Sequence, residues 1–166
     1  PELAGVSITD ALENKKTQRD EQGILFAYGV MLYTDPEFTR QMISSEKTIT
    51  PKNIILEKLK TGSVLTDLSK RALHRGIFDG RYKFTRYFSA DSHHLPEDLD
   101  QLKIHNDLEL YDTWQDPDEM HNLALAENVD WSMIDGFREK TNNLIKKEVG
   151  NDFGDELLGP EFLYKL

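Results

Sequence analysis

The chain has 166 residues, 38% of them hydrophobic and 30% charged, which fits one folded domain with extensions and excludes wholesale disorder. Its formal net charge of -10 argues against nucleic acid and membrane surfaces as partners, and no apolar run reaches the roughly 18 residues of a membrane span. The chain contains no cysteine, so disulfides, thiolate catalysis and cysteine-ligated zinc are excluded.

The N-terminal part of the chain is predicted to be a connector followed by one strand. Residues 1–22 are a polar connector with a short helix that Ser7 caps and that ends near Leu12. Residues 23–29 are a short apolar run between two glycines, which favours a buried strand. Because the chain begins at Pro1 without a leader pattern, we expect a soluble protein with further polypeptide upstream; the compartment, bacterial cytoplasm or periplasm, stays open.

Residues 30–70 are predicted to be a helical insertion. Asp35-Pro36 and Thr50-Pro51 each place a proline where the first turn of a helix accepts it, and apolar residues follow at helical spacing.

The strongest local pattern lies in residues 71–88. Asp79-Gly80 between two β-rich runs predicts a two-residue hairpin turn, which would place Phe78 opposite Arg81 and Ile77 opposite Tyr82. Side chains alternate along a strand, so one face is expected to pack on a helix. That face comprises Leu73, Ile77, Tyr82, Phe84 and Phe88, and the other carries His74, Lys83 and Thr85.

The remaining elements follow in order. Residues 89–107 read as a polar loop with one helical turn after Pro96, residues 108–112 as a strand, and residues 130–150 as a helix that packs on the hairpin. Residues 151–166 are an extended tail. The fold class is therefore α+β, a small antiparallel sheet packed against a C-terminal helix with a helical insertion. The predicted core aromatics are Tyr82, Phe84, Trp131 and Phe137.

Three segments, taken in this order, resemble the C-terminal end of the sulfatase family in the alkaline phosphatase superfamily. Pro1–Ile8 is similar to the segment after the last catalytic-domain helix, and Arg75–Phe84 is similar to an Arg-x-Gly-x-Tyr-Lys-Tyr hairpin. Glu109–Ala124 matches the Glu-Leu-Tyr-Asp-x-x-x-Asp-Pro-x-Glu-x-x-Asn-Leu-Ala signature almost position for position, and it is the specific match of the three.

The resemblance implies that residues 1–166 are the C-terminal domain of a sulfatase, a sulfuric ester hydrolase, docked on its own N-terminal catalytic domain. In the family that larger domain carries a formylglycine made from Cys-x-Pro-x-Arg or Ser-x-Pro-x-Arg, a calcium ion and the sulfate-ester site. This chain has no cysteine and no serine followed by that pattern, so we expect no cofactor here and no activity of the chain alone. A free-standing binding module, or a domain of a phosphoester or phosphonoester hydrolase, remains the alternative.

Candidate site residues follow from the same resemblance. Tyr28, His74 and Arg75 are expected on strands near the rim of the catalytic cleft, where cationic groups suit a sulfate ester. The alternative is that Arg75 packs at the domain interface and His74 is merely exposed.

Two apparent metal clusters have simpler explanations. Asp116, Glu119 and Asn122 read as a turn with capping side chains rather than as metal ligands. His93, His94 and His105 with Asp91 are expected to be solvated, because a zinc site needs three or four convergent ligands.

An uncovered docking surface is the last expectation. Ile24, Leu25 and Phe26 form so apolar a strand that cover on both faces is expected in a parent protein, and the chain alone is expected to self-associate.

Overall fold

The computed structural model describes residues 9–13, 23–28, 69–89 and 95–150, together with Glu37, Arg40 and Asp67. Three predicted segments lie wholly or mostly outside the described residues. They are the tail 151–166, residues 90–94 of the polar loop, and the helical insertion 30–70. In chain order the elements are α1 (Thr9–Leu12), β1 (Ile24–Tyr28), β2 (Leu73–Phe78), β3 (Tyr82–Phe88), α5 (Leu99–His105), β4 (Asp107–Asp112), the 3-10 helix η2 (Leu123–Leu125) and α6 (Trp131–Glu148).

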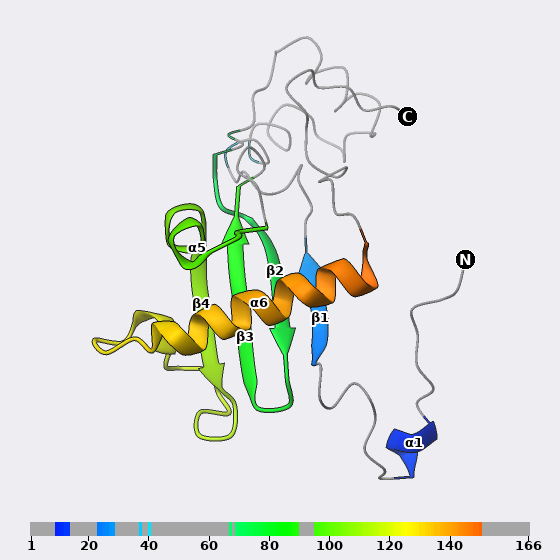
Figure 1. Ribbon diagram of the computed structural model, residues 1–166. Helices are drawn as coiled ribbons and strands as arrows, with labels where there is room; N and C mark the ends of the chain where they lie inside the picture. The colour runs from blue at the N-terminus through cyan, green and yellow to red at the C-terminus, as the bar shows by residue number, and fades with distance from the viewer. Residues whose placement is uncertain are drawn as a thin grey trace.

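The four strands form one antiparallel sheet in the order β1-β2-β3-β4, and α6 crosses one face of it (Figure 1). This confirms the predicted α+β class and the packing of the C-terminal helix on the sheet. The helix is longer than the sheet is wide: its 18 residues extend about 27 Å, whereas the axes of four strands span about 14 Å. Both ends of α6 therefore project past the outer strands, as Figure 1 shows.

The turn of the β2-β3 hairpin differs from the prediction by two residues. Phe78 pairs with Lys83 rather than with Arg81, and the backbone N–H of Asp79 donates to Tyr82 O at 3.2 Å. Gly80 and Arg81 are thus the turn residues, and Gly80 supplies the positive φ of 98° that the turn requires.

The cause of this shift is the carboxylate of Asp79. Its Oδ1 accepts from the backbone N–H groups of Arg81 at 3.0 Å and Tyr82 at 2.8 Å, which holds Asp79 opposite Tyr82, one residue past the end of β2. Because the shift is an even number of residues, every side chain keeps its predicted face. The core accordingly contains Leu73, Ile77, Phe84 and Phe88 with Leu102, Leu110, Ile134, Leu144 and Ile145.

The helix-facing side of the sheet also buries charge. Arg86 is fully buried, and its Nη1 donates to Asn142 Oδ1 of α6 at 2.8 Å. Phe84 and Phe137 stack beside it with ring centroids 5.8 Å apart. The buried guanidinium of Arg86 therefore links the sheet to α6. Alternation along β3 predicts that Arg86 lies on this face, but the pattern of apolar residues does not predict that it is buried.

Trp131 is not in the core, contrary to the prediction. It is the first residue of α6, at the end that projects past β4, and 36% of it is exposed. The ammonium of Lys103 lies 4.0 Å from the centre of its ring. Helical spacing placed Trp131 on the correct face of the helix, but no strand lies beneath that end in the part of the chain that the structure describes.

The N-terminal strand is only partly buried. Ile24 is 49% exposed, while Leu25 and Phe26 are half-buried, so the prediction of a buried strand is too strong for this chain. The ring of Phe26 lies over Gly76 on β2, where a Cβ atom would meet it at 2.3 Å. Glycine is thus required at this position by a cross-strand aromatic contact.

The segment before β4 is more regular than predicted. α5 runs for two turns from Leu99 to His105, and the Asp98 carboxylate caps it by accepting from Gln101 N at 2.8 Å. Within the described residues, no helix is long and apolar enough to span a bilayer.

Candidate functional site

The three predicted site residues do not form one cluster. His74 and Arg75 are neighbours on β2, so their side chains leave opposite faces of the sheet. The register pairs His74 with Tyr28 on β1 and with Tyr87 on β3, which puts these three positions in one row across the face away from α6. Arg75 lies on the α6 side, 8% exposed, with its guanidinium 5.6 Å from the centre of the Phe88 ring.

His74 lies between two aromatic rings on the outer face, the face of the sheet that α6 does not cover. Its ring centroid is 6.1 Å from that of Phe26 and 5.4 Å from that of Tyr87, both in edge-on geometry. Burial lowers the pKa of His74 below its usual 6.5, the charge of Arg75 lowers it further, and Glu109 opposes the shift. At neutral pH the ring is therefore an uncharged hydrogen-bonding group rather than a cation for sulfate.

Tyr87 and Glu109 extend this row and were not singled out from the sequence. The phenol of Tyr87 donates to Glu109 Oε2 at 3.0 Å, and burial, followed by that bond, raises the pKa of Tyr87 to about 12. Burial likewise raises the pKa of Tyr111, and the charge of Glu109 adds to it. Alternation could have placed Tyr87 on the same face as His74, Lys83 and Thr85, but only the observed register puts it opposite His74. Glu109 carries no comparable local signal, because strand pairing brings it there.

The described side chains of the outer face can form hydrogen bonds with a ligand. None of them is an evident nucleophile. A phenol that titrates near 12 stays protonated, and the nearby carboxylate is already an acceptor. A neutral imidazole can donate or accept one bond. Such a surface can orient a polar ligand or pack on another domain.

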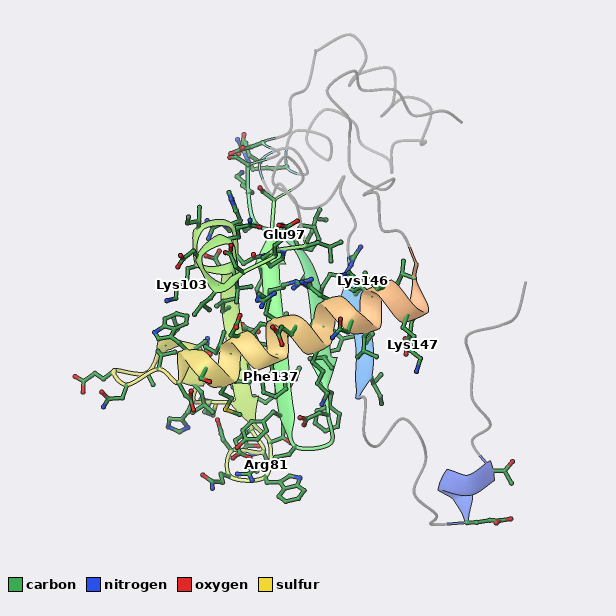
Figure 2. All side chains as sticks on the ribbon, viewed as in Figure 1. Arg81, Glu97, Lys103, Phe137, Lys146 and Lys147 are labelled. Carbon is green, nitrogen blue, oxygen red and sulfur yellow. The ribbon has the colours of Figure 1, made fainter. Side chains whose placement is uncertain are left out.

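The signature segment Glu109–Ala124 joins the hairpin through an ion pair. Arg81 at the hairpin turn donates from Nε to Asp112 Oδ1 at 3.0 Å and from Nη2 to Oδ2 at 2.6 Å. The hydrogen bond from Arg81 holds the pKa of Asp112 below its usual value. Trp114 completes the contact, because its Nε1 donates to Gly80 O at 3.0 Å and its ring lies 5.4 Å from the guanidinium (Figure 2 labels Arg81).

The acidic cluster of the signature is a turn, as predicted. Asp116 Oδ2 accepts from His121 N at 2.7 Å, and the backbone N–H groups of His121 and Met120 lower the pKa of Asp116. Glu119 does not cap the backbone, since it pairs with Lys83 Nζ at 2.6 Å. Among the residues that the structure describes, no three histidine or acidic side chains are grouped as metal ligands.

Asn122 of the signature makes three hydrogen bonds with its side-chain amide. Its Nδ2 donates to Leu108 O at 2.9 Å, and its Oδ1 accepts from Leu110 N at 3.0 Å and from Ala124 N at 2.9 Å. One side-chain amide therefore reproduces the hydrogen bonds of a peptide unit along β4 and caps η2 as well.

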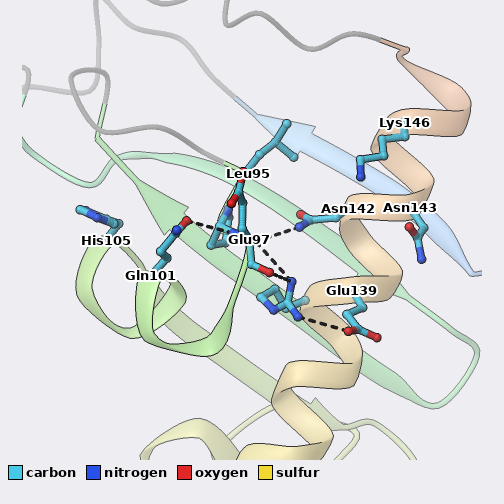
Figure 3. Close-up of a pocket in the computed structure, with 10 residues that line it drawn as sticks. Leu95, Glu97, Gln101, His105, Glu139, Asn142, Asn143 and Lys146 are labelled. Atoms are coloured by element: carbon cyan, nitrogen blue, oxygen red, sulfur yellow. Dashed lines mark hydrogen bonds and ion pairs between the residues drawn. The ribbon is translucent and has the colours of Figure 1, made fainter.

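A polar cleft of about 910 Å³ opens between residues 95–105 and α6 (Figure 3). Its inner wall is structural: Arg138, almost fully buried, donates to Glu97 O at 2.7 Å and to Asp135 at 2.6 Å, and Asn142 donates to Pro96 O at 2.9 Å. Its rim is formed by the half-buried Gln101 and by four exposed side chains, His105, Glu139, Asn143 and Lys146. The base of the cleft fixes the chain before α5, and its rim offers mixed polar groups. His105, from the rejected metal cluster, lies here; Asp91, His93 and His94 lie outside the described residues.

Comparisons with known proteins add no relative: no family model, no curated protein and no solved structure matches the chain.

Proposed function

We propose that this chain is the C-terminal domain of a sulfatase, which stabilises an N-terminal catalytic domain and contributes to the rim of its substrate cleft. The observation that carries the proposal is the Arg81–Asp112 pair. It joins the hairpin and the signature, two segments that resemble the family independently in sequence, by two hydrogen bonds of 3.0 and 2.6 Å. Signature residues with such defined structural roles support a shared architecture rather than a chance match.

The chain has a supporting role in this proposal. Formylglycine, calcium and the sulfate-ester site belong to the catalytic domain, and the chain has no cysteine from which a formylglycine could be made. Of the three rim candidates, His74 and the position of Tyr28 lie on the outer face, which is the face proposed to line the cleft. Arg75 lies under α6, so its part is packing within the domain.

The test compares the chain with the natural full-length polypeptide that contains it. With an aryl sulfate as substrate, the chain alone is expected to give no turnover with or without calcium, and the full-length protein is expected to hydrolyse it. Turnover by the chain alone that survives repurification would contradict the proposal.

The same experiment separates the alternatives. Hydrolysis of phosphate or phosphonate esters by the full-length protein, without sulfatase activity, would assign the chain to a related hydrolase. A natural polypeptide with no nucleophile-bearing domain would favour the free-standing binding module.

A further inference from the structure

A pocket of about 510 Å³ lies beside β4, at the end of α6 that projects past the sheet (Figure 1). Residues of α5, β4 and η2 line it together with Trp131, the first residue of the helix. At this edge of β4, the amide of Asn122 closes the backbone by bonding Leu108 O and Leu110 N. The described sheet ends at β4, so no further strand fills the hollow. Its volume is that of a site for a small molecule.

The wall of this pocket is largely apolar. Leu125 is 79% exposed and Trp131 is 36% exposed, and Leu108 and Ala124 also line the pocket. Large apolar side chains that are exposed around a hollow favour an apolar ligand group, because binding removes both surfaces from water. The ligand of this pocket is therefore expected to have an apolar portion.

Both carboxylates that line the pocket already have partners. The Oδ1 of Asp107 accepts from Arg71 Nη1 at 2.6 Å. The Oε2 of Glu109 accepts from the phenol of Tyr87 at 3.0 Å. A cationic ligand would have to compete with these partners, so the charge of the pocket does not favour a cation.

Lys103 is the charged side chain of the pocket that is left for a ligand. Its ammonium lies 4.0 Å from the centre of the Trp131 ring, and no carboxylate in the described part of the chain pairs with it. The ring holds this long side chain in place without neutralising its charge. Figure 2 shows Lys103 beside this end of α6. The pocket thus presents one positioned positive charge, which favours an anionic group on the ligand.

The pocket also has a buried acceptor that lacks a donor. Asn106 lines it and is only 4% exposed. Its Nδ2 donates to Tyr87 O at 3.1 Å, which fixes the orientation of the amide because a carbonyl can only accept. Among the described residues, no group donates to its Oδ1. A buried carbonyl oxygen without a donor is unfavourable, so an N–H group on the ligand would stabilise this site.

We propose that this pocket binds an N-acylated apolar amino acid with a free carboxylate, either as a small molecule or as the C-terminal residue of a polypeptide. The carboxylate pairs with Lys103, and the N–H of the ligand donates to Asn106 Oδ1. The apolar side chain packs on Leu125 and Trp131. This inference does not depend on the sulfatase proposal.

The two tryptophans of the chain allow one titration to locate the site. The probe is N-acetyl-L-leucine, and the readout is the pair of indole N–H signals in ¹H–¹⁵N spectra. Trp114 lies at the hairpin turn, where it is 72% exposed, and serves as the internal control. We expect the signal of Trp131 to shift to saturation and that of Trp114 to stay in place. No shift of Trp131, or equal shifts of both signals, would overturn the proposal.

Two analogues of the probe test the two polar contacts separately. N-acetyl-L-leucinamide lacks the negative charge, and (S)-2-acetoxy-4-methylpentanoate has an ester oxygen in place of the N–H. We expect each to bind about tenfold more weakly than N-acetyl-L-leucine, because each leaves one hydrogen bond unmade. Equal binding of the leucinamide contradicts the role of Lys103, equal binding of the ester contradicts that of Asn106, and either result rejects the proposed ligand.

Lys103→Met tests the charge from the side of the protein, with Lys146→Met as the matched control. Both substitutions remove one positive charge from an exposed lysine, but Lys146 lies about 22 Å from Trp131 along α6. We expect Lys103→Met to weaken binding of N-acetyl-L-leucine by about tenfold and to remove its advantage over the leucinamide. Lys146→Met should retain both. Equal effects of the two substitutions would show that net charge alone acts, which rejects the site.

The tripeptide acetyl-Ala-Ala-Leu distinguishes the two sources of the ligand. Tighter binding of the tripeptide than of N-acetyl-L-leucine assigns the pocket to the C-terminus of a polypeptide. Equal or weaker binding assigns it to a small acylated amino acid. Leu125→Ser, at a side chain too exposed to support the fold, should weaken binding of both ligands, and unchanged binding of both would contradict the apolar contact.

Discussion

At one edge of this sheet, a single side-chain amide makes two of the hydrogen bonds that a neighbouring strand would otherwise make. Asn122 is placed by the turn that Asp116 organises, and its two amide atoms meet a carbonyl and an N–H of β4. Aspartate has the same size but lacks the donor, and alanine lacks both groups. The position is therefore specific for asparagine on chemical grounds.

Asn122→Ala is expected to lower the free energy of unfolding by about 1–3 kcal/mol, because it leaves Leu108 O and Leu110 N without their partner. Urea unfolding followed by circular dichroism measures it. Asn143→Ala, at an exposed amide of α6, is the matched control and should change the midpoint little. Equal effects of the two substitutions would show that the amide bonds of Asn122 contribute nothing.

His74 predicts a pH dependence of stability. Its folded pKa lies below 6.5, chiefly through burial between Phe26 and Tyr87, with Arg75 adding to the shift and Glu109 opposing it. The unfolded chain therefore takes up this proton first as the pH falls, and the stability that neutral His74 contributes is lost below about pH 6.5.

Urea midpoints measured between about pH 7 and pH 5 test this linkage, since that interval spans the unperturbed histidine pKa. His74→Gln is expected to reduce the loss of stability on acidification. An unchanged slope in His74→Gln would contradict the assignment.

At the scale of the elements, two glycines should respond to alanine in opposite directions. At Gly76 a Cβ would lie 2.3 Å from the Phe26 ring and 2.8 Å from Phe84 O, whereas at Gly136 of α6 it would meet nothing within 4 Å. Gly76→Ala should therefore destabilise the fold by about 1–3 kcal/mol. Gly136→Ala should stabilise it by about 0.5–1 kcal/mol through helix propensity.

Thermal unfolding of both variants measures these shifts, and a double-mutant cycle identifies the contact. Part of the loss in Gly76→Ala should disappear when Phe26→Ala is already present, because the ring that meets the new methyl group is gone. Fully additive effects would mean that the ring does not restrict this site.

The elements show which features local sequence carries. Alternation of apolar residues is enough to predict the strands of the sheet and their two faces, and helical spacing is enough to predict α6. Each of these elements has one apolar face that the local sequence shows. The hairpin register was not accessible in the same way, since it depends on Asp79 bonding the turn backbone rather than joining the turn. Trp131 was misplaced because helical spacing identifies a face but not how far the sheet extends beneath it.

In the candidate site, too, some features follow from local sequence and others depend on contacts between distant segments. That His74 and Arg75 leave opposite faces follows from alternation alone, although the family resemblance grouped them. Bringing Glu109 to Tyr87 requires the pairing of strands that are distant in sequence, which no local pattern specifies. The structural role of the Asp116 turn was predictable because its residues bond within a few positions of one another.

For the whole molecule, the neighbours His74 and Arg75 should affect different properties of the full-length protein. Under the proposed function, His74→Ala raises KM for a sulfate ester by about 2- to 10-fold with little change in kcat, as expected for one neutral hydrogen bond. Arg75→Met leaves KM unchanged and lowers the unfolding midpoint, because Arg75 packs on Phe88 beneath α6. Steady-state kinetics and thermal unfolding of both variants separate the roles; a KM effect in Arg75→Met alone would reverse them.

Closure of the β4 edge also bears on polymerisation. A filament built by joining sheets side by side needs two free edges on every molecule, and this chain has a partner for the β4 edge in Asn122. In the part of the chain that the structure describes, Asn122 therefore hinders edge-to-edge growth at β4. Loss of the Asn122 amide would leave Leu108 O and Leu110 N open to a strand of another molecule, so we expect this residue to disfavour edge-to-edge association.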